Sequence, residues 1–417
     1  MEKKKKLKIL ACPANKGGCA YYRIIMPMEK LAELYPDDVE VRFNYDPLDG
    51  EGSKERGGLL LKPHESEDLK WADVVFFHNI HNYGGPYTVE LLKSAMELGK
   101  FTHYDTDDLL TDLYDGHRLK DTYNDLGLSE MTKAIYANSD MVSVTQRKFA
   151  ERIQPFVTKA LVIMKNAIDY NMPCWNAPKV PVPNKKHTRI GWAGGIHHEE
   201  DVKEFRSVAM GVNAKVGVPN VSWNFFGRPP KGPGNKERIA KGEESPDNDE
   251  WQQEVWDNYE KSLSFGVSGK RNVLFHPAMA SNEYGFMFRG LDIVIAPLQM
   301  NNFNDSKSEI KAMEAGRYGL PLVASNVGCY DEIIKNGETG YLIDPTNPRR
   351  DWIKALSTLC KNRKLREELG ANLKKITDEY YDINKVVGGR LELYKEVMGI
   401  KDRALTASKY QTLPGND

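Results

Sequence analysis

The sequence predicts an α/β protein with two doubly wound domains, each built around a parallel β-sheet. Three observations support this prediction. The 417 residues suffice for about two or three domains with their own cores. Apolar runs of strand length alternate with helical patterns, which indicates crossover connections and sheets buried on both faces. The alternation stops at a proline-rich stretch and then restarts, so a second domain of the same kind follows the first.

In the first half, each short apolar run is followed by a polar stretch or by a helical pattern. Helices are predicted over residues 26–34 and 88–98 from apolar residues on one face. Strands are predicted over 7–11, 39–43, 74–77, 101–104, 141–144 and 161–164.

A polar stretch with Pro173, Pro178, Pro181 and Pro183 cannot continue a helix or a central strand, so it is predicted to be a linker. Beyond it, helices are expected over 202–216, 352–359 and 365–398, and strands over 189–192, 222–226, 273–275, 293–296, 322–324 and 341–343. The predicted organisation is a first domain over 1–170, a linker over 171–188, a second domain over 189–375 with a mobile insertion over 228–270, a helix over 376–400 that crosses back to the first domain, and a tail over 401–417.

The composition excludes several classes of protein. Lys and Arg total 58 and Asp and Glu total 59, so no global positive field would hold the chain on nucleic acid or on an anionic membrane. The five cysteines form no CxxC pair and are odd in number, which indicates free thiols in a reducing compartment. The first apolar run is too short for a signal sequence or a membrane span. The expected location is the cytoplasm, with peripheral membrane association left open.

Ligands of open parallel sheets bind at the carboxyl ends of the strands, so we expect the site in a cleft that both domains face. The strongest signal lies after the predicted strand 293–296, where a polar loop over 301–308 opens a helix carrying Lys307, Lys311 and Glu314. Ser308 is expected to cap that helix, and an anion would meet both its N-terminus and Lys307. A diphosphate suits such a site. Glu314 would then accept hydrogen bonds from a ribose, although an ordinary ion pair with Lys311 fits the spacing equally well.

This stretch resembles the nucleotide-sugar site of retaining glycosyltransferases of the GT-B fold, the group 1 enzymes of glycosyltransferase family four. Their pattern reads E-x-F-G, then E-A-x-x-x-G-x-P-V-V-A-S, then G and a glutamate, then G-x-x-G. The residues that match are Glu314, Ala315, Gly319, Pro321, Val323, Ala324, Ser325, Gly328, Glu332, Gly337 and 340–342. The resemblance implies two Rossmann-like domains facing a cleft, a nucleoside-diphosphate-sugar as co-substrate, no required cofactor, no metal, and Glu314 as the ribose ligand.

One departure from that pattern affects the donor site. The first glutamate of the family's E-x7-E pair falls at Ser306, so the usual acidic contact to the donor sugar is missing. In its place stands FNDSKSEIK, which resembles a variant in which lysine and serine at the helix N-terminus contact the diphosphate. The resemblance therefore implies donor-site roles for Asn304, Lys307 and Ser308.

Other donor-side candidates follow strands of the second predicted domain. Gly194 and Gly195 form a turn through which backbone N–H groups approach a ligand, but a tight turn before a helix fits as well. Arg228 follows the next strand and suits a pyrophosphate, although a merely exposed arginine fits there too. His276, with Pro277 and Tyr284, is a candidate for the base pocket, with core packing as the alternative.

The first predicted domain offers candidates on the acceptor side and at the reacting sugar. Gly17 and Gly18 shape the loop after the first strand, and Arg23 begins the helix beyond it. His78 matches the family's histidine near the reacting sugar, where it would stabilise charge as the glycosidic bond breaks; a loop histidine without a task is the alternative. Either Asp105 or Asp107 is expected to cap a helix, and both are candidates for binding acceptor hydroxyls.

The sequence favours transfer of a hexose-type sugar to an acceptor hydroxyl with retention of configuration. Two alternatives stay open: a GT-B epimerase or phosphorylase, and a catalytically silent protein that binds a nucleotide sugar or a carbohydrate. The acceptor is a glycan, a lipid carrier or hydroxylated DNA. Phosphate of the last two would contact the basic cluster Lys231, Lys236, Arg238 and Lys241, which otherwise is a solvated loop.

Overall fold

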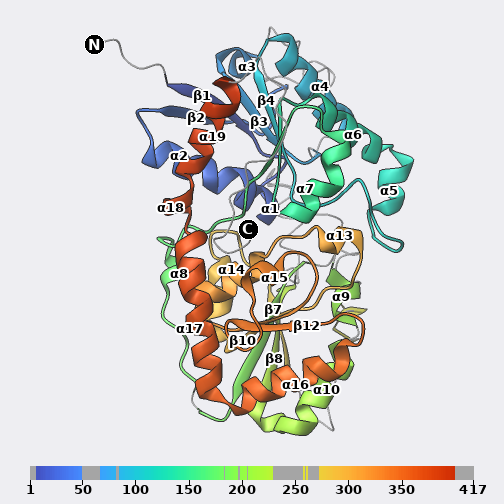
Figure 1. Ribbon diagram of the computed structural model, residues 1–417, viewed down its shortest axis with the longest axis vertical. Helices are drawn as coiled ribbons and strands as arrows, with labels where there is room; N and C mark the ends of the chain where they lie inside the picture. Colours follow the sequence, from blue (N-terminus) through green and yellow to red (C-terminus); the bar gives the residue numbers. More distant parts are fainter. Residues whose placement is uncertain are drawn as a thin grey trace, which may run out of the picture. The chain divides into compact units, whose positions relative to one another are not determined.

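The computed structural model describes residues 6–48, 66–80, 84–182, 184–195, 198–203, 205–228, 257–258, 260–261 and 272–399. The chain divides into two compact units (Figure 1). The first unit takes its residues from Met1–Asp169, Asn301–Ser308 and Tyr380–Asp417, and the second from Tyr170–Met300 and Glu309–Glu379.

The first unit contains a six-stranded parallel sheet in the order β2-β1-β3-β4-β5-β6. Its strands are β1 (Leu7–Cys12), β2 (Val39–Phe43), β3 (Val74–His78), β4 (Phe101–Asp105), β5 (Met141–Val144) and β6 (Ala160–Ile163). Its helices are α1 (Gly18–Ala20), the π-helical turn η1 (Tyr21–Ile25), α2 (Met26–Leu34), α3 (Glu67–Trp71), α4 (Gly85–Glu97), α5 (Lys120–Asp125), α6 (Leu128–Asn138), α7 (Arg147–Ile153), the single turn η3 (Gln154–Phe156), α13 (Asn302–Asp305), α18 (Ile383–Val386) and α19 (Gly388–Gly399).

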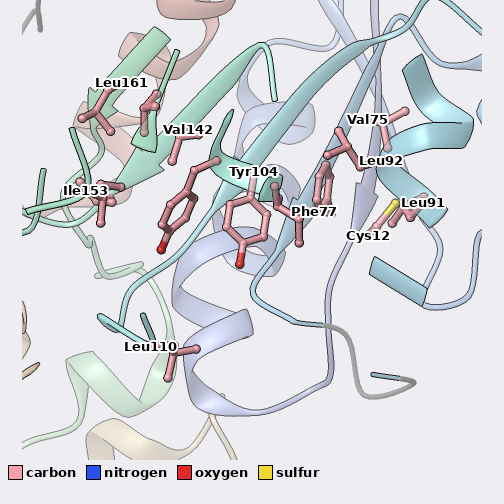
Figure 2. Packing of buried hydrophobic residues seen from close by; sticks show 14 of the residues in the cluster. Cys12, Val75, Phe77, Leu91, Leu92, Tyr104, Leu110, Val142, Ile153 and Leu161 are labelled. Atoms are coloured by element: carbon pink, nitrogen blue, oxygen red, sulfur yellow. The ribbon is translucent and has the colours of Figure 1, made fainter. Parts of the chain in front are cut away.

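Successive residues of the central strands pack into cores on opposite faces of this sheet. Ile9 belongs to the cluster that α2 and α19 cover, and Leu10 belongs to the cluster that α4, α6 and α7 cover. In the second cluster the rings of Tyr104 and Phe77 lie 5.3 Å apart (Figure 2). Burial on both faces explains why β1 and β3 are mostly apolar, whereas β4 also buries the polar residues Thr102, His103 and Asp105.

The second unit contains another six-stranded parallel sheet, in the order β12-β11-β10-β7-β8-β9. Its strands are β7 (Thr188–Ala193), β8 (Val221–Arg228), β9 (Val273–Pro277), β10 (Ile293–Ala296), β11 (Leu322–Ser325) and β12 (Gly340–Ile343). Its helices are α8 (Pro173–Asn176), α9 (Glu199–Lys203), α10 (Phe205–Val216), the 3-10 turns η5 (Val218–Asn220) and η6 (Tyr284–Gly290), α14 (Ile310–Arg317), α15 (Tyr330–Ile333), α16 (Pro348–Lys361) and α17 (Arg363–Tyr380).

Aromatic rings dominate one core of the second unit. Phe205 of α10 lies edge-on to Trp223 of β8, with ring centroids 5.8 Å apart, and to Trp352 of α16, at 5.1 Å. All three side chains are buried. This cluster holds α10 and α16 against the sheet.

The prediction of two doubly wound parallel-sheet domains is confirmed. Two predictions of secondary structure, one of a helix and one of the linker, need correction. The stretch 365–398 is three helices, because the chain breaks at Tyr381 and Asp382 caps α18. The linker contains the one-turn helix α8, because a proline at the first helical position lacks only an N–H group that would be unpaired there. Most of the insertion predicted over 228–270 lies outside the described residues.

A buried histidine joins α19 to the first sheet. His103 in β4 places Nδ1 2.7 Å from the Tyr394 hydroxyl of α19 and Nε2 2.8 Å from the Ser143 hydroxyl of β5. Its ring stacks on Phe76 with centroids 4.1 Å apart. Burial lowers the pKa of His103 to about 3, so the ring is neutral in the folded protein.

This buried histidine predicts a pH-dependent stability. Between pH 6.5 and about 3 the unfolded chain binds a proton at His103 that the folded chain does not, so stability rises with pH. The contribution is about 1.4 kcal/mol per pH unit over that window. Urea unfolding of the wild type and His103→Gln between pH 4 and 8 measures it. We expect the variant to lose this part of the slope; an unchanged slope would contradict the buried neutral ring.

Gly370 of α17 packs closely against the turn before β11, and we therefore expect its replacement by alanine to destabilise the fold. A Cβ at Gly370 would lie 2.1 Å from the carbonyl oxygen of Gly319. Replacing a helical glycine by alanine ordinarily stabilises, but here we expect Gly370→Ala to destabilise by about 1–3 kcal/mol through overpacking. Urea unfolding followed by circular dichroism measures the change, with exposed Glu368→Ala on the same helix as the control. Stabilisation by Gly370→Ala would refute the close packing.

Candidate functional site

In the first unit, polar side chains gather at the carboxyl ends of adjacent strands. His78 ends β3 and pairs in register with Asp105, which ends β4. The loop after β1 passes through Gly17 and Gly18 into α1 and η1, where Arg23 lies. The topology therefore brings to one sheet edge the candidates that sequence analysis assigned to the first domain.

A buried ion pair forms the centre of this edge. The guanidinium of Arg23 donates from Nη2 to Asp105 Oδ2 at 2.6 Å and from Nε to Asp105 Oδ1 at 2.9 Å. Neither side chain has exposed surface, and Ser143 donates a further hydrogen bond to Asp105. Burial alone would raise the pKa of Asp105, but the charge of Arg23 outweighs it and holds that pKa below its ordinary value.

These contacts correct two predictions. Asp105 caps no helix, because its carboxylate is engaged by Arg23 and the residues after β4 form a turn. Arg23 and Asp105 are also bonded to one another, and every guanidinium nitrogen of Arg23 already donates to Asp105, Met164 or Asn166 instead of to an acceptor. They position the sheet edge instead.

Arg23 also connects this edge to the segment 301–308. Its Nη1 donates to the carbonyl oxygen of Met164 at 2.5 Å and to Asn166 Oδ1 at 3.0 Å. Asn166 Nδ2 in turn donates to Ser308 Oγ at 2.9 Å. Ser308 is therefore not the cap of α14, contrary to prediction, because α14 begins at Ile310 after Glu309, without a side-chain cap.

His78 is buried beside two carboxylates. Its Nε2 lies 3.4 Å from Asp107 Oδ1 and 4.0 Å from Asp105 Oδ1. Asn79 Nδ2 donates to Asp107 at 3.0 Å. Burial would raise the pKa of Asp107, but the His78 and Asn79 contacts lower it overall. In the described part of the chain, His78 Nδ1 has no hydrogen-bond partner although it is buried.

The segment 301–308 packs within the first unit. Asp305 of α13 forms ion pairs with Lys148 at 3.1 Å and Arg152 at 2.8 Å. Lys307 lies in the turn after α13, and not in a helix as expected. Its Nζ is 3.2 Å from Asp108 Oδ1 and 4.5 Å from the centroid of the Phe303 ring.

Two further residues of this segment are buried. Asn304 has 2% of its surface exposed, and Ser306 has none. Ser306 Oγ donates to the carbonyl oxygen of Asn302 at 2.8 Å. Ser306 thus occupies, as a small internally bonded side chain, the position where the related pattern has a glutamate.

In the second unit, α14 carries a buried charge network. Lys311 Nζ lies 2.7 Å from Glu314 Oε2 and donates to the Tyr284 hydroxyl at 2.7 Å. Burial would lower the pKa of Lys311, but Glu314 and Tyr284 raise it overall. Burial and the Glu314 charge raise the pKa of Tyr284 to about 12. Lys311 and Glu314 therefore form the ion pair that sequence spacing offered as one alternative.

The remaining candidates of the second unit lie at the carboxyl ends of its strands. Gly194 follows β7, where a Cβ would lie 2.3 Å from the Trp192 ring, whereas a Cβ at Gly195 would meet nothing within 4 Å. Arg228 ends β8, and its side chain lies outside the described residues.

His276 in β9 stacks on Phe226 with centroids 4.3 Å apart. Its Nε2 lies 3.0 Å from Asn224 Oδ1, and burial lowers its pKa. These contacts hold the His276 ring, and its contact to a nucleotide base stays a prediction. The cluster 231–241 lies outside the described residues.

Sequence analysis predicted no partner for Asn166 or for Asp108. Asn166 stands 143 residues from Arg23, and Asp108 stands 199 residues from Lys307. The only local signal for their role was their position in the chain. Each follows a predicted strand and therefore lies at the carboxyl edge of the sheet.

The described residues contain neither a metal-binding cluster nor a helix that could cross a membrane. No three His, Cys, Asp or Glu side chains among them gather so as to hold a metal ion. None of the helices within the described ranges has the length and apolar character that crossing a bilayer requires.

Part of the chain is similar to known glycosyltransferases. The model of the family "Glycosyl transferases group 1" matches residues 253–376. The D-inositol 3-phosphate glycosyltransferase of Paenarthrobacter aurescens is 32% identical over 132 residues, which is 31% of this chain and 31% of that enzyme. The enzyme of that name from Rhodococcus jostii is 33% identical over 100 residues, 24% of this chain and 20% of the enzyme. The chain thus spans no more than about a third of these relatives.

Solved structures extend the likeness to the whole fold. HepE of Anabaena in complex with UDP and glucose has a TM-score of 0.61 at 12% identity, covering 94% of this chain and 99% of that one. Sucrose-phosphate synthase of Thermosynechococcus elongatus has a TM-score of 0.60 at 13% identity, covering 95% and 100%. Residues 253–376 thus match the group 1 family model, and the chain has the GT-B fold that the sequence resemblance implied.

Proposed function

We propose that the protein is a glycosyltransferase that moves a sugar from a nucleoside-diphosphate-sugar to an acceptor hydroxyl, with retention of configuration and without a metal. The observation that carries the proposal is the group 1 match over residues 253–376, which includes the loop and helix that sequence analysis assigned to the donor. The structural relative HepE was solved with UDP and glucose, so a uridine nucleotide is the first donor to test.

In the second unit, Glu314 is our candidate for the ribose. It is a fully buried carboxylate whose Oε2 is already held by Lys311. A carboxylate fixed in this way accepts hydroxyl hydrogen bonds without reorganising. We also assign Gly194, Gly195 and Arg228 to the diphosphate, and His276 to the base.

The cation for the departing diphosphate is Lys307, supported by Asn304 and Ser308. Charge develops on the diphosphate as the glycosidic bond breaks, and a cation that meets it there lowers the barrier more than one that binds donor and transition state equally. Lys307 already pairs with a carboxylate, Asp108, at 3.2 Å. In the proposed reaction it exchanges this partner for the diphosphate.

In the first unit, His78 is our candidate for the reacting sugar. Its buried Nδ1 lacks a partner among the described residues, and such an atom costs free energy unless a ligand satisfies it. Asp107 at 3.4 Å fixes the ring. The pair would stabilise positive charge on the sugar or a proton in transfer.

Ser306 favours a second candidate function, that of a nucleotide-sugar-binding protein without turnover. A serine has no carboxylate for a donor sugar, and the hydroxyl of this buried residue already donates to the Asn302 carbonyl oxygen. Calorimetric binding of a donor without turnover on glycan or lipid-carrier acceptors would support this alternative against the enzyme.

The role of Lys307 predicts a kinetic effect. Removing one charge-stabilising group from a transition state typically costs about a hundredfold to a thousandfold in rate. We expect Lys307→Ala to lower kcat/KM for the donor by about that factor while thermal unfolding is nearly unchanged. The control is Lys354→Ala, an exposed lysine of α16. Wild-type turnover by Lys307→Ala would remove Lys307 from the site.

The role of Glu314 predicts an effect that depends on the ribose. Hydrogen bonds to a charged acceptor are about twice as strong as neutral ones. We therefore expect Glu314→Gln to weaken UDP binding about tenfold and to narrow the difference in affinity between UDP and 2′-deoxy-UDP, measured by calorimetry. If both nucleotides weaken equally, Glu314 supports the helix and not the ribose.

A further inference from the structure

A second concave site lies at the amino ends of the strands of the second unit, the edge opposite to the carboxyl ends considered above. The pocket has a volume of about 340 Å³. Its walls include Arg189 at the start of β7, Asp292 just before β10, Pro321 just before β11 and the first turn of α17. None of its lining residues belongs to the proposed donor site.

Positive side chains outnumber negative ones in this pocket. Its cations are Lys179, Lys185, Arg189, Arg363 and Arg366, and its carboxylates are Asp292 and Glu367. The carboxylates are already paired, Asp292 with Arg189 at 3.0 Å and Glu367 with Arg363 at 2.7 Å. Within the described ranges, the other three cations form no ion pair.

The excess of positive charge in the pocket is least favourable at Arg366, which is buried. It is only 7% exposed, and its Nη1 donates to the Leu359 carbonyl oxygen at 2.7 Å and to Thr188 Oγ1 at 3.2 Å. Its Nε and Nη2 donate to no group in the part of the chain that the structure describes. Burial lowers its pKa, the sign of a charged form that is poorly solvated. A buried cation of this kind is stabilised by an anion.

Lys179 and the first turn of α17 add further positive charge next to Arg366. Lys179 lies at the rim, and among the described residues its Nζ donates only to the Gly319 carbonyl oxygen, at 3.3 Å. The first turn of the 18-residue helix α17 also lines the pocket, and the positive end of a helix dipole favours negative charge.

We propose that this pocket binds a small phosphate dianion, either inorganic phosphate or the phosphate group of a monoester. The free N–H groups of Arg366 suit two phosphate oxygens at once, and Lys179 supplies a point charge. A volume of about 340 Å³ accommodates a phosphate with a small organic part. The proposal does not rest on glycosyl transfer, and it adds a ligand at the far edge of the sheet.

Calorimetric titration of the full chain with inorganic phosphate and with glycerol 3-phosphate tests this site, at constant ionic strength set with sodium chloride. We expect one saturable site that Lys179→Gln weakens severalfold and Arg366→Met weakens at least tenfold. Lys354→Gln removes the same charge from an exposed position outside the pocket and should bind like the wild type.

Two further measurements test whether the heat of phosphate binding comes from the proposed donor site instead of from this pocket. Saturating UDP and the variant Lys307→Ala should both leave phosphate binding at this pocket unchanged. The proposal is overturned if no saturable binding occurs, if Lys354→Gln weakens binding as much as Lys179→Gln, or if UDP or Lys307→Ala abolishes it. Because Lys179 is exposed, Lys179→Gln keeps the test decisive even if Arg366→Met fails to fold.

Discussion

The buried ion pair between Arg23 and Asp105 is the interaction on which the first unit's sheet edge depends. Two charges without exposed surface are costly unless hydrogen bonds satisfy their remaining groups. Here Ser143 donates to Asp105, while the Met164 carbonyl and Asn166 accept from Arg23. The same network reaches Ser308 through Asn166, so the pair that fixes the strand ends also fixes the segment that carries Lys307.

The second unit applies the same principle around Glu314. A carboxylate with no exposed surface is paired with Lys311 at 2.7 Å, and Lys311 in turn donates to the Tyr284 hydroxyl. In the proposed function, the atoms that stabilise α14 would also bind the ribose. This explains how a residue that packs like core can also serve a ligand, and why the ion pair and the proposed ribose contact do not exclude one another.

The inner strands were predictable because burial on both faces makes them apolar runs, and the bounds of Met141–Val144 and Ile293–Ala296 agree residue for residue. The bounds of the edge strand Val39–Phe43 agree as well, although most of its residues are not buried. Helix ends were less predictable, as the break at Tyr381 shows. The partners of site residues were unpredictable for another reason. Lys307 meets Asp108 and Ser308 meets Asn166 across long sequence separations, and only the fold places such residues together.

The central claim is that this chain binds a nucleoside-diphosphate-sugar, with Lys307 as the proposed contact to the diphosphate. A thermal-shift screen with UDP-, GDP-, ADP- and TDP-sugars tests it most directly, because a ligand that binds only the folded protein raises its melting temperature. The account predicts that one base raises the melting temperature of the wild type, and that the rise is lost in Lys307→Ala. A screen in which none of these donors changes the melting temperature would contradict it.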